Sequence, residues 1–395
     1  MLDIDEQVKD AYQGDSIPKE VYIRLYNRTT SLYPSGTLYP SDDIYPDMHL
    51  HFAHEFRNAD IISETMTIVE ALCGGEISYR NCVSSSLDVE ITNVKEDIQG
   101  MDIQVLQEVN NVTVPLFKGI IDTAKKSGAK TRRKIKAYDS LYFRYKEDIT
   151  EWYNALSFPM TCYDFRIALC KAFGMPYVVQ TLINDDIYVN KAEVSNITGR
   201  DLLMMIGEFN GAFVQVNRNN QIKFVSLYRY NYIYPSDDRL VEGLFPGAQT
   251  NAKAFEQANT YIDCEYGDYM VQEINRLTVK ENGEAVGTYG TGLNAYNIDD
   301  NVLFADMDAD VMQDVLEGIY ANIGGIYYVP HKTTIKGRPY VECGDVINVK
   351  IGDMQSIDTY VFKRTLKGVQ SLRDTYEADG EECHSKLYEV GEWTE

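Results

Sequence analysis

The only histidine cluster of the sequence stands at His49, His51 and His54. Three imidazoles can hold a transition metal. In a strand, however, side chains alternate between faces, so His49 and His51 would share one face and His54 would lie on the other. The remaining histidines, His331 and His384, are remote in the sequence. We therefore assign no metal site, and the role of this histidine cluster stays open.

A group of acidic residues imitates a calcium-binding loop. Asp306, Asp308 and Asp310 alternate along the chain, and Glu317 is twelfth. Val311, however, stands where the sharp turn of such a loop needs glycine. The residues from Asp310 onward have helical spacing, so carboxylates at the positive end of a helix explain the pattern better. Calcium binding is not expected.

Other motifs that carry chemistry are missing. The glycine-rich stretch 287–292 lacks the Gly-Lys-Ser/Thr ending of a phosphate-binding loop, and a hairpin or loop is expected there. The cysteines are odd in number and form no Cys-x-x-Cys pair, which favours scattered reduced thiols. They are Cys73, Cys82, Cys162, Cys170, Cys264, Cys343 and Cys383. No hydrolase or zinc-protease motif occurs. We expect no enzyme, no cofactor and no catalytic residue.

A basic stretch interrupts the acidic chain around a predicted hairpin turn at Ser127-Gly128. Its cations could be solvated charges on both strands. They could equally contact an acidic patch on another subunit. Direct DNA binding is the weakest interpretation, because no aromatic platform interleaves with them. The cations are Lys125, Lys126, Lys130, Arg132, Arg133, Lys134 and Lys136.

Length and composition describe an acidic protein rich in tyrosine. The 395 residues suffice for about two to four domains. Acidic residues outnumber basic ones by 60 to 37, and the resulting net charge of −23 repels nucleic acid and anionic membranes. The 30 tyrosines suit half-buried sheets and subunit contacts, although a β-rich fold alone also explains them. Without a transmembrane run or a signal peptide, folding in the cytoplasm is expected.

Local patterns predict five parts. Residues 1–50 contain a strand at Val21–Arg28 and an arm in which Tyr-Pro recurs between 33 and 46. The arm could drape over a neighbouring subunit or form a surface loop. Residues 51–140 alternate as short strands, with Ile77–Cys82 among them. Helical spacing follows, with Thr198 as a plausible N-cap. Turns are expected at Asn219-Asn220, Asn282-Gly283 and Gly352-Asp353. The predicted parts are 1–50 (strand and arm), 51–140 (first β-barrel), 141–243 (α+β insert), 244–325 (second α+β insert region) and 326–395 (second β-barrel).

Several stretches, in this order, resemble the baseplate or tail hub proteins of phages and phage-tail-like particles of Gram-positive bacteria. SIPKEVYIRLYN resembles the opening strand of that family, and ADIISETMTIVEALCGGEISYRNCVSSSLDVEI its first barrel. FKGIIDTAKKSGAKTRRKIKAYDSLYF is similar to the strand pair that closes the barrel. ITGRDLLMMIGEFNGAFVQVNRNNQIKFVSL is similar to the insert helix and hairpin. KGRPYVECGDVINVKIGD and RTLKGVQSLRDTYEADGEE resemble the second barrel.

The resemblance implies a mainly β fold in which two β-barrel tube-type domains flank inserted α+β domains, in a trimeric hub. Six barrels would then match a hexameric tail tube above and a three-fold tip below. The implied partners are two further copies, a tail tube or distal tail protein, tip, spike or receptor-binding proteins, and a tape measure protein. Neither stable nucleic-acid binding nor a membrane anchor is implied. The protein would be made in the bacterial cytoplasm and assembled at the distal tail end of a virion, prophage particle or tailocin.

Two features depart from the family. Many relatives continue into receptor-binding or wall-degrading regions, whereas this chain stops at Glu395, so such modules are expected on other polypeptides. The Tyr-Pro units at 33–46 resemble an insertion. Two alternatives stay open: a carbohydrate-binding or glycoside-cleaving β protein of a tail tip, whose paired carboxylates could be any of the 60 acids, and a distal tail ring protein.

Overall fold

A computed structural model describes residues 6–13, 19–28, 50–227, 256–258, 261–350 and 356–383, together with Leu2 and Ile4. The Tyr-Pro arm and the turn expected at Gly352-Asp353 lie outside these residues. Within them, the protein is mainly β, with α+β segments inserted between the β parts. This confirms the predicted fold class at that level.

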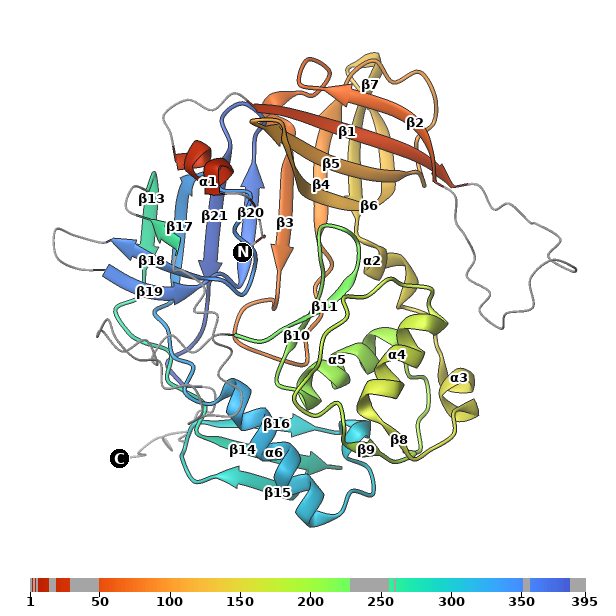
Figure 1. The fold of residues 1–395 in the computed structure, drawn as a ribbon, viewed down its shortest axis with the longest axis vertical. Coiled ribbons are helices and arrows are strands. Elements are labelled where there is room, and N and C mark those ends of the chain that lie inside the picture. Colours follow the sequence, from red (N-terminus) through yellow and green to blue (C-terminus); the bar gives the residue numbers. More distant parts are fainter. Residues whose placement is uncertain are drawn as a thin grey trace, which may run out of the picture.

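One sheet of eleven strands runs through the upper part of the molecule (Figure 1). We call its larger portion the first lobe. In spatial order, the first lobe consists of β3 (Thr67–Ala71), β4 (Ser86–Ile91), β7 (Ala129–Tyr138), β6 (Val112–Ser127), β5 (Asp102–Val109), β1 (Lys19–Arg28) and β2 (Leu50–Arg57). A 3₁₀ turn, η1 (Ser63–Thr65), precedes β3.

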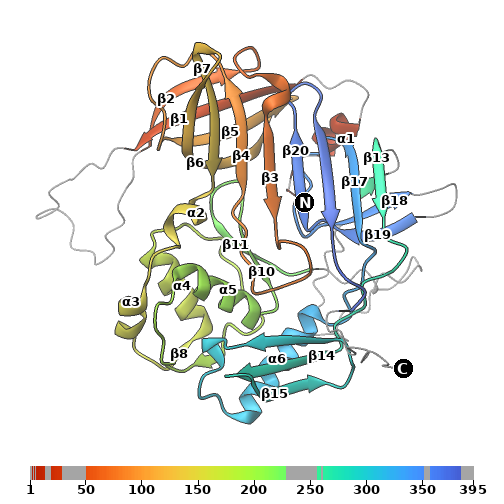
Figure 2. The same cartoon turned by 180° about the vertical axis from the view of Figure 1, so that it is seen from behind.

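The rest of that sheet belongs to what we call the second lobe. Its strands in the large sheet are β13 (Asp263–Tyr266), β17 (His331–Lys336), β21 (Arg373–Ala378) and β20 (Lys363–Lys367). A second sheet of three strands completes the lobe, with β12 (Glu256–Ala258), β18 (Val346–Lys350) and β19 (Ser356–Tyr360). The helix α1 (Glu6–Gln13) lies beside the second lobe (Figures 1 and 2).

The two lobes are joined by backbone pairing between β3 and β20. These strands run antiparallel, from Thr67 opposite Lys367 to Ala71 opposite Lys363. Since a strand pair of this length carries a continuous ladder of hydrogen bonds, it fixes the lobes in one register. Alternating burial explains why the strands form: in β4, Leu87, Val89 and Ile91 face the core.

None of the sheets among the described residues closes into a barrel. In the first lobe, however, the chain that follows β2, the last strand in spatial order, comes back to β4. The segment after β2 bonds the end of β4, where Ile62 N donates to Glu90 O at 2.9 Å and Thr92 N to Asp60 O at 2.8 Å. The first lobe is therefore a strongly rolled sheet whose two sides meet through a short irregular segment.

The first insert follows β7 and packs below the first lobe (Figures 1 and 2). Its helix α5 begins as predicted: Thr198 Oγ1 accepts from Asp201 N at 3.2 Å, and Asp201 Oδ2 accepts from Thr198 N at 3.0 Å. The expected hairpin turn contains Asn220, with a positive φ of 64°. Its elements are α2 (Ser140–Arg144), α3 (Thr150–Ala155), β8 (Met160–Thr161), α4 (Cys162–Ala172), β9 (Tyr188–Val189), α5 (Gly199–Phe209), β10 (Phe213–Val216) and β11 (Ile222–Val225).

The second insert forms the lower end of the molecule (Figure 1). A small sheet packs against one helix, in which Val315, Leu316 and Ile319 are buried. The predicted turn at Asn282-Gly283 is present, with positive φ at both residues. The elements are β14 (Arg276–Glu281), β15 (Glu284–Gly290), β16 (Ala295–Asp299), η3 (Val302–Phe304) and α6 (Ala309–Ile323).

The strand predicted at Ile77–Cys82 is wrong. Apart from a single bridge at Cys82, this segment makes no strand pairing among the described residues. Side chains bond its backbone instead: Tyr296 Oη faces Tyr79 N at 3.1 Å, and the guanidinium of Arg200 donates to Cys82 O. The alternating apolar residues are buried as predicted, but against the inserts and without a ladder.

Candidate assembly site

Four buried charged residues meet where the two lobes and the first insert join. Glu70 lies on β3, Arg364 on β20, Asp374 on β21, and Arg218 between β10 and β11. All four are 5% exposed or less. We call this group the junction cluster. It links three parts of the chain that are far apart in sequence.

Arginine forks set the geometry of the junction cluster. Arg218 Nε and Nη2 each lie 2.9 Å from one carboxylate oxygen of Glu70. Arg364 Nη1 lies 2.8 Å from Glu70 Oε2, and Arg364 Nη2 lies 2.9 Å from Asp374 Oδ1. Two cations thus balance two carboxylates, and Arg218 also donates to the carbonyl oxygens of Pro339 and Val341 in the second lobe. Bidentate pairs of this kind fix direction as well as distance.

Electrostatics keep the junction cluster ionised. Burial alone would raise the pKa of Glu70, but Arg218 and Arg364 outweigh it and lower that pKa from 4.5 to about 2. Burial would lower the pKa of Arg364, but Asp374 and Glu70 outweigh it and raise that pKa. Breaking such a buried pair costs far more than breaking a surface pair. The junction cluster therefore holds the two lobes and the first insert in one arrangement.

The junction cluster could not be predicted from the sequence, because Glu70 and its partner Arg364 are 294 residues apart. One signal was present: Glu70 interrupts an otherwise apolar strand, Ile68-Val69-Glu70-Ala71-Leu72. A charged residue at a position expected to be buried needs an opposite charge as its partner.

Two other carboxyl groups have the raised pKa that often marks catalytic acids. Burial raises the pKa of Glu208 to about 7 and that of Asp139 to about 7. Glu208 is 2% exposed and accepts from Tyr296 Oη at 3.1 Å and from Asn301 Nδ2 at 3.0 Å. Asp139 is 1% exposed and accepts from the backbone N–H groups of Ser85 and Leu141. A substrate cannot reach either group in this conformation, so both serve internal packing.

The predicted histidine cluster falls only partly within the described residues. His49 lies outside them, and only the backbone of His51 is described, opposite Asn27 in β1. His54 Nε2 lies 2.6 Å from Glu96 Oε1. The pairing of β1 with β2 shifts between Leu25 and Tyr26, which interrupts the simple alternation that we expected for these histidines. In the described part of the chain, no three His, Cys, Asp or Glu side chains gather as metal ligands.

The calcium-like pattern coincides with a helix start. Asp308 is the N-cap residue of α6, and Asp310 lies in its first turn. Val311 is inside the helix, as predicted. The glycine-rich stretch 287–292 begins within β15 of a hairpin, as expected. All seven cysteines are free thiols, and five of them are buried.

The basic stretch forms the tip of the β6–β7 hairpin, with Gly128 in the turn at φ 59°. Lys125, Lys126 and Lys130 are exposed. Not every charge there is solvated, however: Arg132 Nε donates to Glu90 Oε2 at 2.7 Å, and Arg133 is 6% exposed and caps backbone carbonyl oxygens. We call the end of this hairpin, residues 122–132, the basic ribbon.

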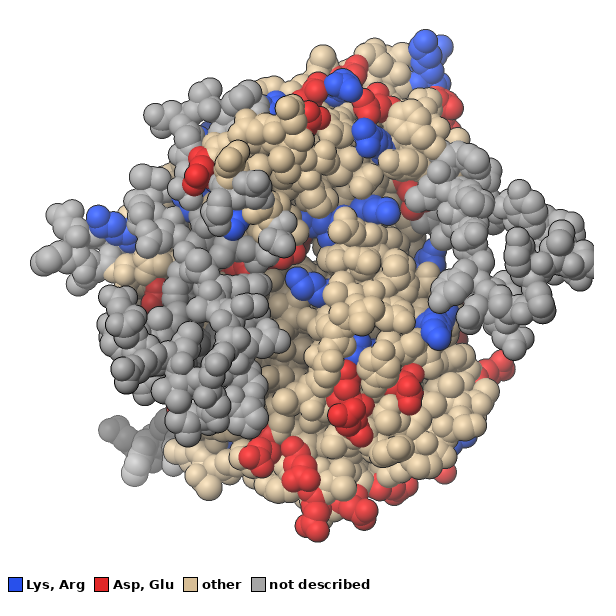
Figure 3. Space-filling model, in the orientation of Figure 1, with Lys and Arg blue, Asp and Glu red and all other residues tan. Residues whose placement is uncertain are grey.

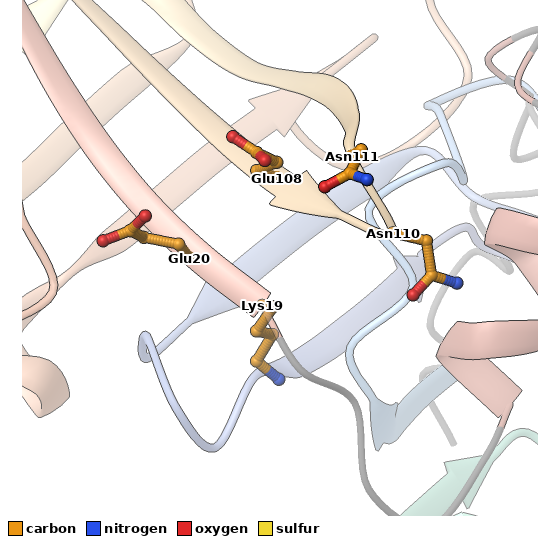
Figure 4. Close-up of a pocket in the computed structure, with 5 residues that line it drawn as sticks. All are labelled: Lys19, Glu20, Glu108, Asn110 and Asn111. Atoms are coloured by element: carbon orange, nitrogen blue, oxygen red, sulfur yellow. The ribbon is translucent and has the colours of Figure 1, made fainter.

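A shallow hollow of about 500 Å³ lies where β1 begins and where β5 turns into β6 (Figure 4). One amine, two carboxylates and two amides line it. They belong to Lys19, Glu20, Glu108, Asn110 and Asn111. Burial and the nearby Lys336 lower the pKa of Lys19. An open rim of mixed polar groups suits a contact surface better than a closed substrate pocket.

No helix in the described part of the chain is long and apolar enough to cross a membrane. No family model matches this sequence, and no curated protein matches it either. Solved structures, in contrast, identify the arrangement of lobes and inserts as a tail-protein fold.

The chain is similar to the tail protein from Neisseria meningitidis MC58, with 12% identity, coverage of 92% of this chain and 97% of that one, and a TM-score of 0.50. It is also similar to the 43 kDa tail protein of prophage MuSo2 from Shewanella oneidensis, with 10% identity, coverage of 91% and 96%, and a TM-score of 0.49. A third similar structure is the Francisella PdpA-VgrG complex, with 10% identity, coverage of 95% and 62%, and a TM-score of 0.48. The predicted resemblance to tail proteins is confirmed at the level of the fold, and its Gram-positive detail stays a prediction.

Proposed function

We propose that this chain is a structural hub subunit of a phage-type tail, located where the tail tube meets the tip. The observation that carries the proposal is the tail-protein fold, which extends over almost the whole of both chains compared. At 12% identity that likeness concerns the fold, so the role itself rests on the features below.

The joint between the lobes supports a rigid connecting role. A hub must transmit the position of one partner to another without bending. Here the β3–β20 ladder and the junction cluster fix both lobes and the first insert together. We propose that the lobes are the two tube-type domains, built mainly from 51–140 and 326–395, with β1 added to the first and β12 and β13 to the second. The remaining parts of 141–243 and 244–325 are the proposed inserts.

The rolled first lobe and the two sheets of the second lobe support tube-type domains. A strand that leaves one sheet and enters another makes a corner of the kind found in rolled sheets. β19 and β20 are successive strands in different sheets, and Phe362 N between them donates to Glu377 O at 2.9 Å. We propose a homotrimer in which six such domains line an acidic channel that does not retain DNA.

The proposed role is non-enzymatic. The two carboxyl groups with raised pKa are enclosed, and the described hollow presents mixed polar groups on an open rim. The proposed partners are two further copies, tail tube or distal tail protein, tip or receptor-binding proteins, and a tape measure protein. Assembly into the distal end of a virion or tail-like particle follows from these partners.

Immunogold labelling of purified tail particles tests the proposal. Label confined to the end of the tube where the tip attaches, with three copies per particle, is the expected result. Six copies at the same place would indicate a distal ring protein instead. Unlabelled particles beside abundant free protein would refute the hub role, and the isolated chain would then be tested for binding or cleavage of cell-wall sugars.

A further inference from the structure

Two strand edges of the large sheet, one at its β13 end and one along the last part of β6, have no pairing strand in the described part of the chain. At one end, β13 pairs with β17 only. At the other edge, β6 is longer than β5: their pairing ends at Ile120, and Ile121 still bonds the backbone of Gly100 and Met101 just before β5. The last six residues of β6, Asp122–Ser127, therefore have β7 on one side and none of the described strands on the other.

The opposite side of the basic ribbon is partly occupied. Val94 N donates to Thr131 O at 2.9 Å, so a loop of the first lobe bonds the outer edge of β7. The β6 edge is therefore the one that is open to another strand. Unpaired edges of this kind readily accept a strand from a second chain.

The two edges differ in charge and both reach solvent. On the ribbon, Lys125 and Lys126 are exposed. On β13, Asp263 and Glu265 are exposed, and Tyr266 is 51% exposed. Just before β13, Ile262 is 59% exposed. The β13 edge is thus acidic with apolar neighbours, and the projecting β6 edge is basic.

We propose that the free edge of β6 in one copy pairs with the β13 edge of a second copy, so that copies assemble head to tail. The inference deepens the proposed hub role, since it names the surface through which the copies would join. Because successive side chains alternate, Lys125 and Lys126 lie on opposite faces of the ribbon, so one of them lies on the face that carries Asp263 and Glu265. The contact thus supplies both a backbone ladder and at least one cross-strand ion pair.

The proposed contact joins two different surfaces of the chain. The β13 and β6 edges are different surfaces, so the contact is heterologous, and such contacts close into rings when the rotation between copies allows it. Figures 1 and 2 show β13 and the basic ribbon on different sides of the molecule, as a contact between copies requires.

A protein strand fits this edge better than nucleic acid does. The exposed cations of the ribbon are few, whereas the whole chain has a net charge of −23, so a long polyanion would meet repulsion beyond the ribbon. A backbone edge also offers N–H and C=O groups in the spacing of another strand. The acidic β13 edge satisfies both conditions.

The first experiment is carbodiimide cross-linking of the full chain, which joins Lys to Asp or Glu only where they touch. An equal mixture of ¹⁴N- and ¹⁵N-labelled protein identifies links between copies by mass spectrometry. We expect mixed-isotope peptides that join Lys125 or Lys126 to Asp263 or Glu265. Oligomers whose mixed-isotope links all fall elsewhere, or a chain that stays monomeric at every concentration, would overturn the proposal.

Charge reversal provides the second readout, by sedimentation of the full chain across a concentration series. Lys125→Glu/Lys126→Glu and Asp263→Lys/Glu265→Lys should each raise the half-assembly concentration about tenfold or more, and combining them should restore assembly. Lys171→Glu/Lys191→Glu is the matched control on the first insert and should change nothing. Unchanged assembly in both reversals, or no recovery in the combination, would refute the contact.

The outcomes separate this contact from the hub role. Label at the tail end, together with charge reversals that leave assembly unchanged, would support the hub role and refute the β6–β13 contact. If the isolated chain forms rings that depend on these charges but tails carry no label, the contact would be supported and the hub role refuted.

Discussion

Replacing Arg364 by methionine should test whether the junction cluster holds the lobes together. Arg364→Met leaves Glu70 with Arg218 alone and leaves Asp374 with backbone and hydroxyl donors, so the cluster acquires a buried negative charge. Removing one partner of a buried ion pair costs about 3–5 kcal/mol. The lowered pKa of Glu70 gives the scale for Arg218 and Arg364 together, since a change from 4.5 to about 2 corresponds to about 3 kcal/mol of stabilisation, of which Arg364 contributes a part.

Urea denaturation, followed by far-UV circular dichroism and by tyrosine fluorescence, measures the effect at pH 7. The pH dependence has a definite sign. Because the pKa of Glu70 is lower in the folded protein, its contribution is complete above about pH 4.5 and is lost as the pH falls toward 2. In Arg364→Met this acid-dependent part should shrink.

Arg57→Met provides the matched control. Arg57 is in ion pairs with Glu20 and Glu55, but its side chain is 57% exposed, so a small effect is expected. Adding Asp374→Asn to Arg364→Met should recover part of the loss, because it removes the charge left behind. A loss in Arg364→Met no larger than that in Arg57→Met would refute the structural role of the cluster.

Three further substitutions test other parts of the fold. The folded-state pKa of Glu208 is raised to about 7, so charging this buried group should lower the stability of the protein as the pH rises from 4.5 to about 7. Glu208→Gln should remove this pH-dependent loss, which denaturation midpoints across that range would measure. Thr198→Ala should cost about 1 kcal/mol by removing the cap of α5, as thermal denaturation would reveal, whereas Thr198→Ser should not. Gly344→Leu should detach the second lobe from the first insert and block ring assembly while the first lobe stays folded, because Gly344 has φ 93° and a Cβ there would lie 2.6 Å from Val225. Limited proteolysis and sedimentation would detect this change. Normal tails that contain this variant would contradict the prediction.

Local chemistry could be predicted from the sequence where a few neighbouring residues determine it. The cap at Thr198, the turn at Asn282-Gly283 and the helix beginning near Asp310 depend on interactions within about four residues. The strand predicted at Ile77–Cys82 failed for the opposite reason. The alternation of apolar and polar residues in this segment correctly predicts which side chains are buried. Its backbone groups, however, bond side chains from distant elements instead of forming a strand ladder.

Long-range order could not be predicted in the same way. Nothing near β3 indicates that its partner is β20, and nothing near β13 indicates that it leaves the second insert to pair with β17. Such pairings are selected by the packing of whole sheets, so a single strand does not contain the information. The resemblance to tail proteins supplied the two-lobed plan, which local patterns alone leave open.

The distribution of charge along the molecule bears on the proposed role. Residues 118–136 of the first lobe contain eight Lys and Arg against one Asp, whereas residues 273–323 of the second insert contain ten Asp and Glu against two Lys and Arg. Figure 3 shows a row of Asp and Glu along the lower end, whereas Lys and Arg at the upper end stand among Asp and Glu. The second insert is therefore strongly acidic while the basic segment of the first lobe is not, and surfaces of such different charge favour different partners. Such a difference in charge suits the proposed subunit that joins two unlike structures. Raising the salt concentration should accordingly weaken attachment at both ends while leaving the folded chain intact, because exposed charges are screened and the buried junction cluster is not.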